Sequence, residues 1–215
     1  MKTLYAPGCA LMLYKPELAQ KVLDFLNSQS PIPRLSTCCR NASNIEADTV
    51  VINTCAGCDR RYRENYAGAS TRSLWEILAD SSFPFPDYQG VEMSIHDACP
   101  TRSEARVHDA VRKLLAKMNI KHVEPSHTRE NATCCGDRFY GILPLEQVKQ
   151  QMKNRAAEFP RQDVVVYCVS CIKALHIGGK NPRYLVDLLF KESTVTGHTD
   201  PVRWHAELQR YIDQH

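Results

Sequence analysis

Two kinds of hydrophobic pattern alternate along this chain of 215 residues. Short runs of β-branched and aliphatic residues predict buried strands, at 2–5, 49–52, 91–95 and 163–167. Apolar residues three and four positions apart predict amphipathic helices, at 16–26, 70–80, 103–118, 145–159 and 201–214. The run at 184–190 fits a short helix or a short strand. Strands that alternate with helices are typical of α/β folds with parallel sheets.

One interruption divides this pattern into two halves. The segment 81–90 contains two prolines and ends in Gly90, as an extended connector does. After it, the order of strands and helices begins again. We therefore expect a first repeat at 1–85, a second repeat at 86–200 and a C-terminal helix at 201–215.

The composition is that of an ordinary globular protein, with 43% hydrophobic and 24% charged residues. A formal net charge of +3 is too small to indicate a nucleic-acid partner or a membrane surface. No apolar run approaches the ~18 residues of a membrane helix, and the first residues do not form a signal-peptide core. These features predict a cytoplasmic protein with no membrane span.

The ten cysteines change this picture, because a reducing compartment does not favour structural disulfides. They form two sets of five, and each set reads as one cysteine, an adjacent pair and a Cys-x-x-Cys. The first set is Cys9, Cys38, Cys39, Cys55 and Cys58, and the second is Cys99, Cys134, Cys135, Cys168 and Cys171. The order is kept while the intervals lengthen, which indicates an internal duplication.

Each cysteine group follows a predicted strand or begins a predicted helix. Such turns expose side chains at the carboxyl edge of a sheet, where α/β folds usually bind ligands. A Cys-x-x-Cys at a helix start also meets backbone N–H groups that stabilise thiolate sulfur. The predicted fold is therefore α/β, with two pseudo-symmetric βα repeats that each contain a small, mostly parallel sheet.

Three kinds of chemistry could use five cysteines per repeat. Structural disulfides conflict with the compartment. Structural zinc usually takes four ligands, so sets of five that include an adjacent pair fit it poorly. Clustered thiolates with Cys-x-x-Cys spacing otherwise hold iron–sulfur clusters. Five thiolates exceed the needs of a cubane with four corner irons, so the residues alone leave an unusual cluster or a spare thiol as alternatives.

The second set, with Gly136 directly after its adjacent pair, resembles the cysteine-rich CCG-domain family. The B subunit of heterodisulfide reductase is its best-known member and also carries two copies. The resemblance implies two non-cubane 4Fe–4S clusters, each held by five cysteines. The first set departs from the family pattern, because Arg40 follows its cysteine pair and its intervals are shorter.

The resemblance also implies a function as an oxidoreductase. The leading hypothesis is a disulfide reductase that cleaves a small, anionic disulfide or handles the corresponding thiol between the two clusters. The alternative is an electron-transfer subunit of a flavin- or quinone-linked complex, and a sulfur-handling enzyme such as a desulfurase is a third possibility. The chain has no flavin fingerprint and no ferredoxin motif, so an electron-donating iron–sulfur or flavin protein is expected as partner.

Candidate functional residues lie close to the cysteines. Arg102 and Arg138 each follow a cysteine by three residues and are candidates for binding an anionic substrate. His96 precedes Cys99 and could move a proton, although a buried structural histidine is the alternative interpretation. Three glycines are expected to permit turns near the clusters, at Gly8, Gly57 and Gly136. Other basic residues near cysteines are expected to be mainly surface charges, at Arg60, Arg61, Arg63 and Lys173.

Overall fold

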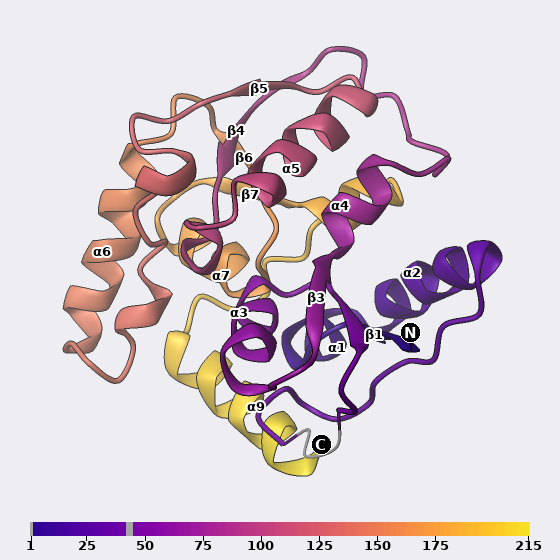
Figure 1. Ribbon diagram of the computed structural model, residues 1–215. Coiled ribbons are helices and arrows are strands. Elements are labelled where there is room, and N and C mark those ends of the chain that lie inside the picture. Colours follow the sequence, from indigo (N-terminus) through magenta and orange to yellow (C-terminus); the bar gives the residue numbers. More distant parts are fainter. Residues whose placement is uncertain (1, 42–44) are drawn as a thin grey trace. The chain divides into compact units, whose positions relative to one another are not determined.

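The computed structural model describes residues 2–41 and 45–215 of the chain (Figure 1). The chain forms two compact units. The first unit combines Met1–Phe83 with Val202–His215, and the second is Pro84–Pro201. Each unit contains one small sheet in which every strand pair is parallel. The predicted α/β fold with two small sheets is therefore confirmed.

The first unit is built on a three-stranded sheet with the order β1-β2-β3. The central strand β2 is buried along its whole length, as its β-branched sequence predicts. The unit consists of β1 (Lys2–Ala6), α1 (Cys9–Tyr14), α2 (Pro16–Gln29), β2 (Thr49–Asn53), α3 (Ala56–Asn65), β3 (Ser70–Ser73), α4 (Leu74–Ala79) and most of α9 (Pro201–Gln214).

The C-terminal helix α9 contacts the segment that carries the first cysteine pair. The backbone N–H of Cys38 donates to the carbonyl oxygen of His215 at 3.0 Å. The side-chain amide of Asn41 donates to the carbonyl oxygen of Ile212 at 2.9 Å. These bonds attach the last residues of the chain to the cysteine loop of the first unit.

The second unit has a four-stranded sheet with the order β5-β4-β6-β7. The chain runs from β4 outward to β5 and then returns past β4 to β6. Right-handed crossovers then place α5 on one face of the sheet and α6 and α7 on the other (Figure 1). The elements are β4 (Glu92–His96), η1 (Cys99–Thr101), α5 (Ala105–Lys117), β5 (Lys121–Val123), η2 (Arg129–Asn131), η3 (Asp137–Phe139), α6 (Leu145–Ala157), β6 (Asp163–Val166), α7 (Val169–Ile177), β7 (Asn181–Tyr184) and α8 (Leu185–Leu189).

The reversal between β4 and β6 makes their carboxyl ends the switch point of this sheet. Ligands of open α/β sheets bind in the crevice at such a point. Cys99 follows β4 and Cys168 follows β6, so the topology brings two cysteine groups to that place.

The main departure from the predicted elements lies at 70–80. Ser70–Ser73 is not helical but pairs with β2 as strand β3, and its side chains alternate between exposed and buried. The helix begins only at Leu74, where Ser73 and Glu76 form a reciprocal capping box. Within 184–190 the strand β7 ends at Tyr184 and a short helix follows it.

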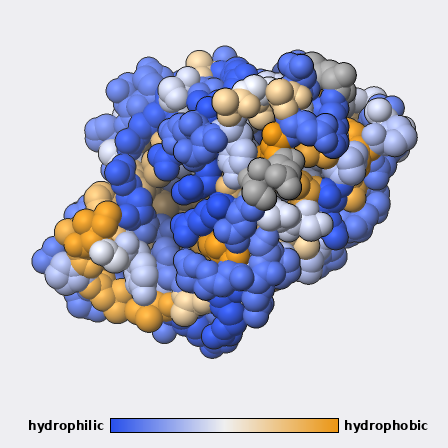
Figure 2. All heavy atoms as spheres, turned by 60° about the horizontal axis from the view of Figure 1, so that its bottom comes forward, coloured by the Kyte–Doolittle hydropathy of each residue, from blue (hydrophilic) through white to orange (hydrophobic). Residues whose placement is uncertain are grey.

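The surface gives no sign of a membrane-spanning helix. None of the helices in residues 2–41 and 45–215 is both long and apolar enough to cross a bilayer. Figure 2 shows a mainly hydrophilic face on which hydrophobic residues gather in separate patches.

Candidate metal centres

The five cysteines of the second unit lie together at the switch point. Cys99 begins η1, while Cys168 caps the N-terminus of α7 and Cys171 lies in its first turn. Cys134 and Cys135 lie in the loop before η3. Segments that are far apart in the sequence therefore deliver all five thiols to one place.

Hydrogen bonds join these five thiols into an unbroken chain. Cys99 Sγ lies 3.7 Å from Cys134 Sγ. Cys134 is also bonded to Cys135, Cys135 to Cys171, and Cys171 to Cys168. The backbone N–H of Gly136 donates to Cys134 Sγ at 3.4 Å, so the backbone also stabilises a thiolate there.

The first unit repeats the same chain with its own five cysteines. The hydrogen-bonded order is Cys9, Cys38, Cys39, Cys58 and Cys55. The backbone N–H of the residue after the adjacent pair again donates to the first thiol of that pair, at 3.5 Å. Matching sequence positions therefore occupy matching places in the two chains of thiols, which supports the internal duplication.

Charge explains why such a set suits a metal centre. The hydrogen bond from Cys135, followed by that from Cys99, lowers the pKa of Cys134 to about 2. In the first unit Cys39 and then Cys9 lower the pKa of Cys38 to about 2. The same hydrogen bonds, followed by burial, raise the pKa of Cys99 and Cys9, because a thiol that donates a hydrogen bond retains its proton. All five sulfurs can ionise together only if a positive centre compensates them.

The donor set decides which centre fits. Each set offers five soft sulfur donors on loops and helix starts, which suits iron–sulfur binding better than four-coordinate zinc. The cysteine clusters in both repeats therefore indicate iron–sulfur binding and electron transfer, with the ten cysteines as the proposed ligands.

Two of the predicted glycines are required by close packing and backbone conformation. Gly8 has φ +83°, and a Cβ there would lie 2.9 Å from Cys55 Cβ and 3.3 Å from Cys58 Sγ. Gly136 has φ +106°, and a Cβ there would lie 2.7 Å from the Cγ of Met152 in α6. Gly57 has no such constraint, since a Cβ there would meet only Cys55 Sγ at an ordinary 3.7 Å.

The first unit has no glycine directly after its cysteine pair. Arg40 stands in that position, and it is not among the described residues with positive φ. The first pair therefore turns differently from the second, where Gly136 packs against α6. The departure from the family pattern at Arg40 thus has a local structural counterpart.

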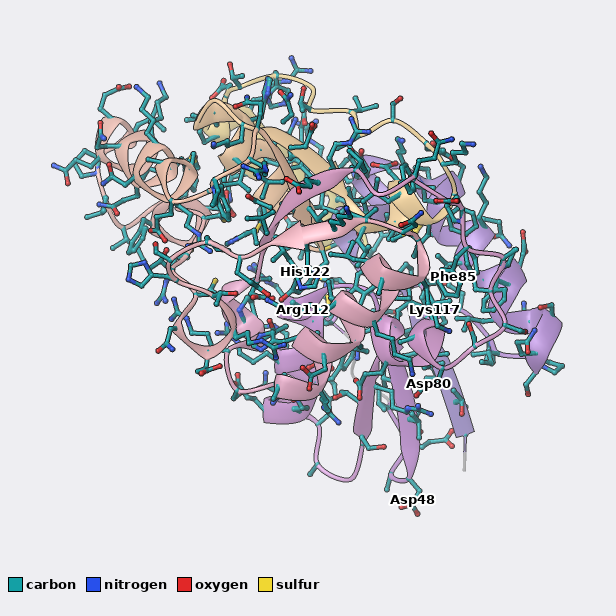
Figure 3. The ribbon with its side chains drawn as sticks, turned by 90° about the horizontal axis from the view of Figure 1, so that it is seen from above. Asp48, Asp80, Phe85, Arg112, Lys117 and His122 are labelled. Atoms are coloured by element: carbon teal, nitrogen blue, oxygen red, sulfur yellow. The ribbon has the colours of Figure 1, made fainter. Side chains whose placement is uncertain are left out.

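A buried polar network supports the cysteine turns of the second unit. Both carboxylate oxygens of Asp97 accept from Arg112 on α5, at 3.0 and 2.8 Å, and Figure 3 labels this arginine. Asp97 also accepts from the backbone N–H of Arg129, and Tyr167 Oη accepts from the N–H of Ala98. Burial opposes ionisation of Asp97, but these donors outweigh it and hold its pKa well below its usual range. The network joins the segments before Cys99, Cys134 and Cys168.

His96 lies beside the sulfurs and not on the surface. One of its ring nitrogens and the Sγ atoms of Cys135 and Cys171 all lie within 4.8 Å of one another. Burial, followed by the charge of Arg155, lowers the pKa of His96 to about 3, so its ring is neutral near neutral pH. The role of His96 in proton transfer stays a prediction.

Arg102 and Arg138 both line a cavity of about 320 Å³ next to the second set. Arg102 Nε donates to the carbonyl oxygen of Ala132 at 2.7 Å, and Arg138 lies over the Phe139 ring. Cys134 forms part of the same wall. The structure thus brings together the two predicted arginines and one candidate ligand. Of the other basic candidates, Lys173 instead donates to the carbonyl oxygens of Thr196 and His198.

Sequence reasoning missed the residues that helix α6 and its C-terminal end contribute to this cavity. These residues are Gln151, Asn154, Arg155 and Glu158. Their spacing of three and four residues places them on one face of a helix. This polar helix face could have been recognised in the sequence, but the sequence does not indicate which segment of the chain it faces.

The comparisons with known proteins agree with the cysteine pattern. The family model described as the CCG cysteine-rich domain matches residues 93–176. No curated protein matches the chain.

Two solved structures have a distant similarity to this chain. Aspartate racemase from Picrophilus torridus has 10% identity and a TM-score of 0.35, with 88% of this chain and 91% of that chain covered. Glutamate racemase isoform RacE1 from Bacillus anthracis has 9% identity and a TM-score of 0.39, with 98% and 82% covered. Both TM-scores are too low to indicate a shared fold.

The family match spans the segment that delivers all five cysteines of the second unit. It begins within β4 and ends within α7. CCG domains are found in subunits of heterodisulfide reductase. The segment from residue 93 to residue 176 is thus similar to the CCG cysteine-rich domain.

Proposed function

We propose that the protein is an iron–sulfur disulfide reductase that acts on a small, anionic disulfide. Its proposed cofactors are two non-cubane 4Fe–4S clusters, one on each set of five cysteines. The proposed domains are the two CCG repeats, at 1–85 and 86–200, with the helix at 201–215 packed on the first unit.

The cavity beside Cys134 is the observation that carries this proposal. Its volume of about 320 Å³ lies at the lower end of the range for small-molecule sites. A protein that only relays electrons needs no such space beside its ligands. A cavity with a candidate ligand in its wall supports the proposal that a second molecule reaches the centre.

The charges around the cavity favour an anionic substrate. Arg102 and Arg138 are both fixed cations that present planar hydrogen-bond donors. Glu158 also lines the cavity, where it pairs with Arg155 and accepts from Thr133 Oγ1. The two arginines therefore favour a carboxylate, sulfonate or phosphate group, since the charge of Glu158 is compensated by Arg155.

The reaction requires a source of electrons outside this chain. Cleavage of one S–S bond consumes two electrons and two protons and yields two thiols. A bound iron–sulfur cluster supplies one-electron chemistry and a metal to which sulfur can bind. The arginines orient the substrate against Cys134, and an iron–sulfur or flavin protein donates the electrons.

Electron relay is the second candidate, and the first unit favours it. The hollow beside Cys9 and Cys38 has a volume of about 20 Å³, which is close to the space of a single water molecule. Tyr211 from α9 helps to line it. The hollow beside the first set is thus much smaller than the cavity beside the second set, which supports electron relay as the role of the first set.

The test uses the full chain, purified anaerobically and reduced chemically. We expect it to convert disulfides with a carboxylate or sulfonate into thiols, and thiols to change the spin-resonance spectrum of the cluster. Arg138→Gln should raise KM for these substrates, and Arg203→Gln, an exposed arginine of the first unit, is the matched control. If no disulfide is cleaved and thiols leave the spectrum unchanged, the protein relays electrons only. Release of sulfide would instead indicate a desulfurase.

A further inference from the structure

His96 occupies a place that the proposed chemistry does not yet use. It is the last residue of β4, and only 1% of its surface is exposed. The Phe159 ring meets it edge to face at 5.7 Å. The ring is not among the residues that line the cavity, so direct contact with a substrate is not its evident role.

One side of the ring is fixed by Arg155. The guanidinium lies 3.4 Å (Nε) and 3.2 Å (Nη2) from His96 Nδ1. Arg155 also donates to the carbonyl oxygen of His127 at 3.0 Å and pairs with Glu158, so its position is well determined. Since a guanidinium can only donate, Nδ1 must accept, and the ring proton must lie on Nε2.

The other side of the ring carries a donor without a protein partner. Among the described residues, His96 Nε2 is one of the few buried side-chain atoms that make no hydrogen bond. Buried donors are normally satisfied, so an unpaired one requires an explanation. The sulfurs of Cys135 and Cys171 are the nearby acceptors, because they share the 4.8 Å group with His96.

We infer that His96 donates an Nε2–H···S hydrogen bond to Cys135 or Cys171 when these cysteines hold the iron–sulfur centre, and that Arg155 is the positioning residue that fixes this tautomer. The inference rests on the proposed cysteine ligands. Hydrogen bonds to cluster sulfurs stabilise the more negative, reduced state and raise the reduction potential.

The matching position in the first unit carries no such donor. His96 ends β4 three residues before Cys99, and Ala6 ends β1 three residues before Cys9. A methyl group cannot donate a hydrogen bond. The second centre, which adjoins the cavity, therefore has a hydrogen-bond donor at a position where the first centre has none.

The tautomer is tested first, on the full chain without metal. We expect nitrogen-15 spectra of labelled histidine to show the His96 ring with its proton on Nε2, assigned by the signal that His96→Gln removes. Arg155→Met should weaken this preference. A wild-type ring protonated on Nδ1 would overturn the inference, whatever the protein catalyses.

The reduction potential is tested next, on the loaded protein. His96→Leu should lower the equilibrium constant for reduction of the second centre about tenfold. This corresponds to a decrease of ~59 mV in the reduction potential of a one-electron couple. His96→Gln, which keeps an amide donor, should retain most of the potential. His122→Gln, on the partly exposed strand β5, is the control and should change nothing.

The outcomes separate this inference from the proposed function. If the second centre has the same reduction potential in the His96→Leu and His122→Gln variants while disulfides are still cleaved, the inference fails and the proposed function stands. A strong nitrogen coupling in spin-resonance spectra would make His96 a direct ligand and would also overturn it. An exchangeable proton coupling that His96→Leu removes would confirm it, even if no disulfide is cleaved.

Discussion

Replacement of Gly136 by alanine tests how closely the second cysteine turn is tied to helix α6. Gly136 adopts φ +106°, and an added Cβ would lie 2.7 Å from Met152 Cγ and 2.8 Å from the Met152 backbone nitrogen. The side chain of Met152 can move, but its backbone nitrogen is part of α6. Relief of the clash therefore requires the turn or the helix to shift.

Two separate costs determine the magnitude. A left-handed conformation costs a residue with a Cβ roughly 1–2 kcal/mol. Insertion of a methyl group into a packed site adds roughly 1–3 kcal/mol. The free energy of unfolding of the second unit should therefore fall by about 2–5 kcal/mol. Gly141 has φ +76° and nothing within 4 Å of an added Cβ, so Gly141→Ala should pay only the first cost.

The assay is urea unfolding of the full, metal-free, reduced chain. Both tryptophans, Trp75 and Trp204, belong to the first unit, so their fluorescence reports on that unit alone. Hydrogen exchange of amides in β4 and α6 reports on the second unit. We expect Gly136→Ala to reduce protection there and to leave the fluorescence transition unchanged. Equal destabilisation by Gly136→Ala and Gly141→Ala would refute the packing argument.

Three further predictions concern the site and its support. Cys38→Ser and Cys135→Ser should each halve the bound iron, because the two chains of thiols share no cysteine; loss of all iron in either variant would contradict this. Arg138→Gln should raise KM several-fold for anionic disulfides and leave a neutral disulfide unaffected, as steady-state rates would show. Arg112→Leu should destabilise the second unit by about 3–5 kcal/mol in urea unfolding near pH 7, because it leaves the Asp97 carboxylate buried and unpaired. The contacts of Asp97 hold its pKa below the ordinary 3.8, so their stabilisation is present above that pH and is lost as the pH falls below it. The wild-type protein and the Arg112→Leu variant should therefore converge in acid, and a constant difference would contradict this reasoning.

The sequence predicts the cysteine sets well because their information is local and repeated. Each set keeps one order of cysteine groups, and its single cysteine and its Cys-x-x-Cys each follow a strand. Such strands and amphipathic helices are identified by their periodicity alone. The α/β fold and the grouping of the cysteines follow from these features.

Short elements with polar sequences are not predictable in this way. β5 has the sequence KHV and β7 has NPRY, and neither shows an aliphatic run. They are strands because β4 and β6 offer partners for them. Likewise Ser70–Ser73 reads as the start of a helix until pairing with β2 makes it a strand. Tertiary context overrides local propensity in each case.

The finer parts of the site depend on packing that no spacing reveals. Nothing in the sequence indicates that Arg155 is 1% exposed or that it meets His96, which is 59 positions away. Nor does it indicate that Arg112 pairs with Asp97 beneath the cysteine turn. The arginines nearest the cysteines could be predicted because they are near in sequence, whereas these partners come from distant helices.

The central claim is that the two sets of five cysteines hold iron–sulfur clusters. Its most direct test is the iron and acid-labile sulfide content of the full chain purified without oxygen, with spin-resonance spectra recorded before and after addition of a thiol. Two 4Fe–4S clusters predict about eight iron and about eight sulfide per chain, and a spectrum that the thiol changes. Bound zinc without sulfide would contradict the account.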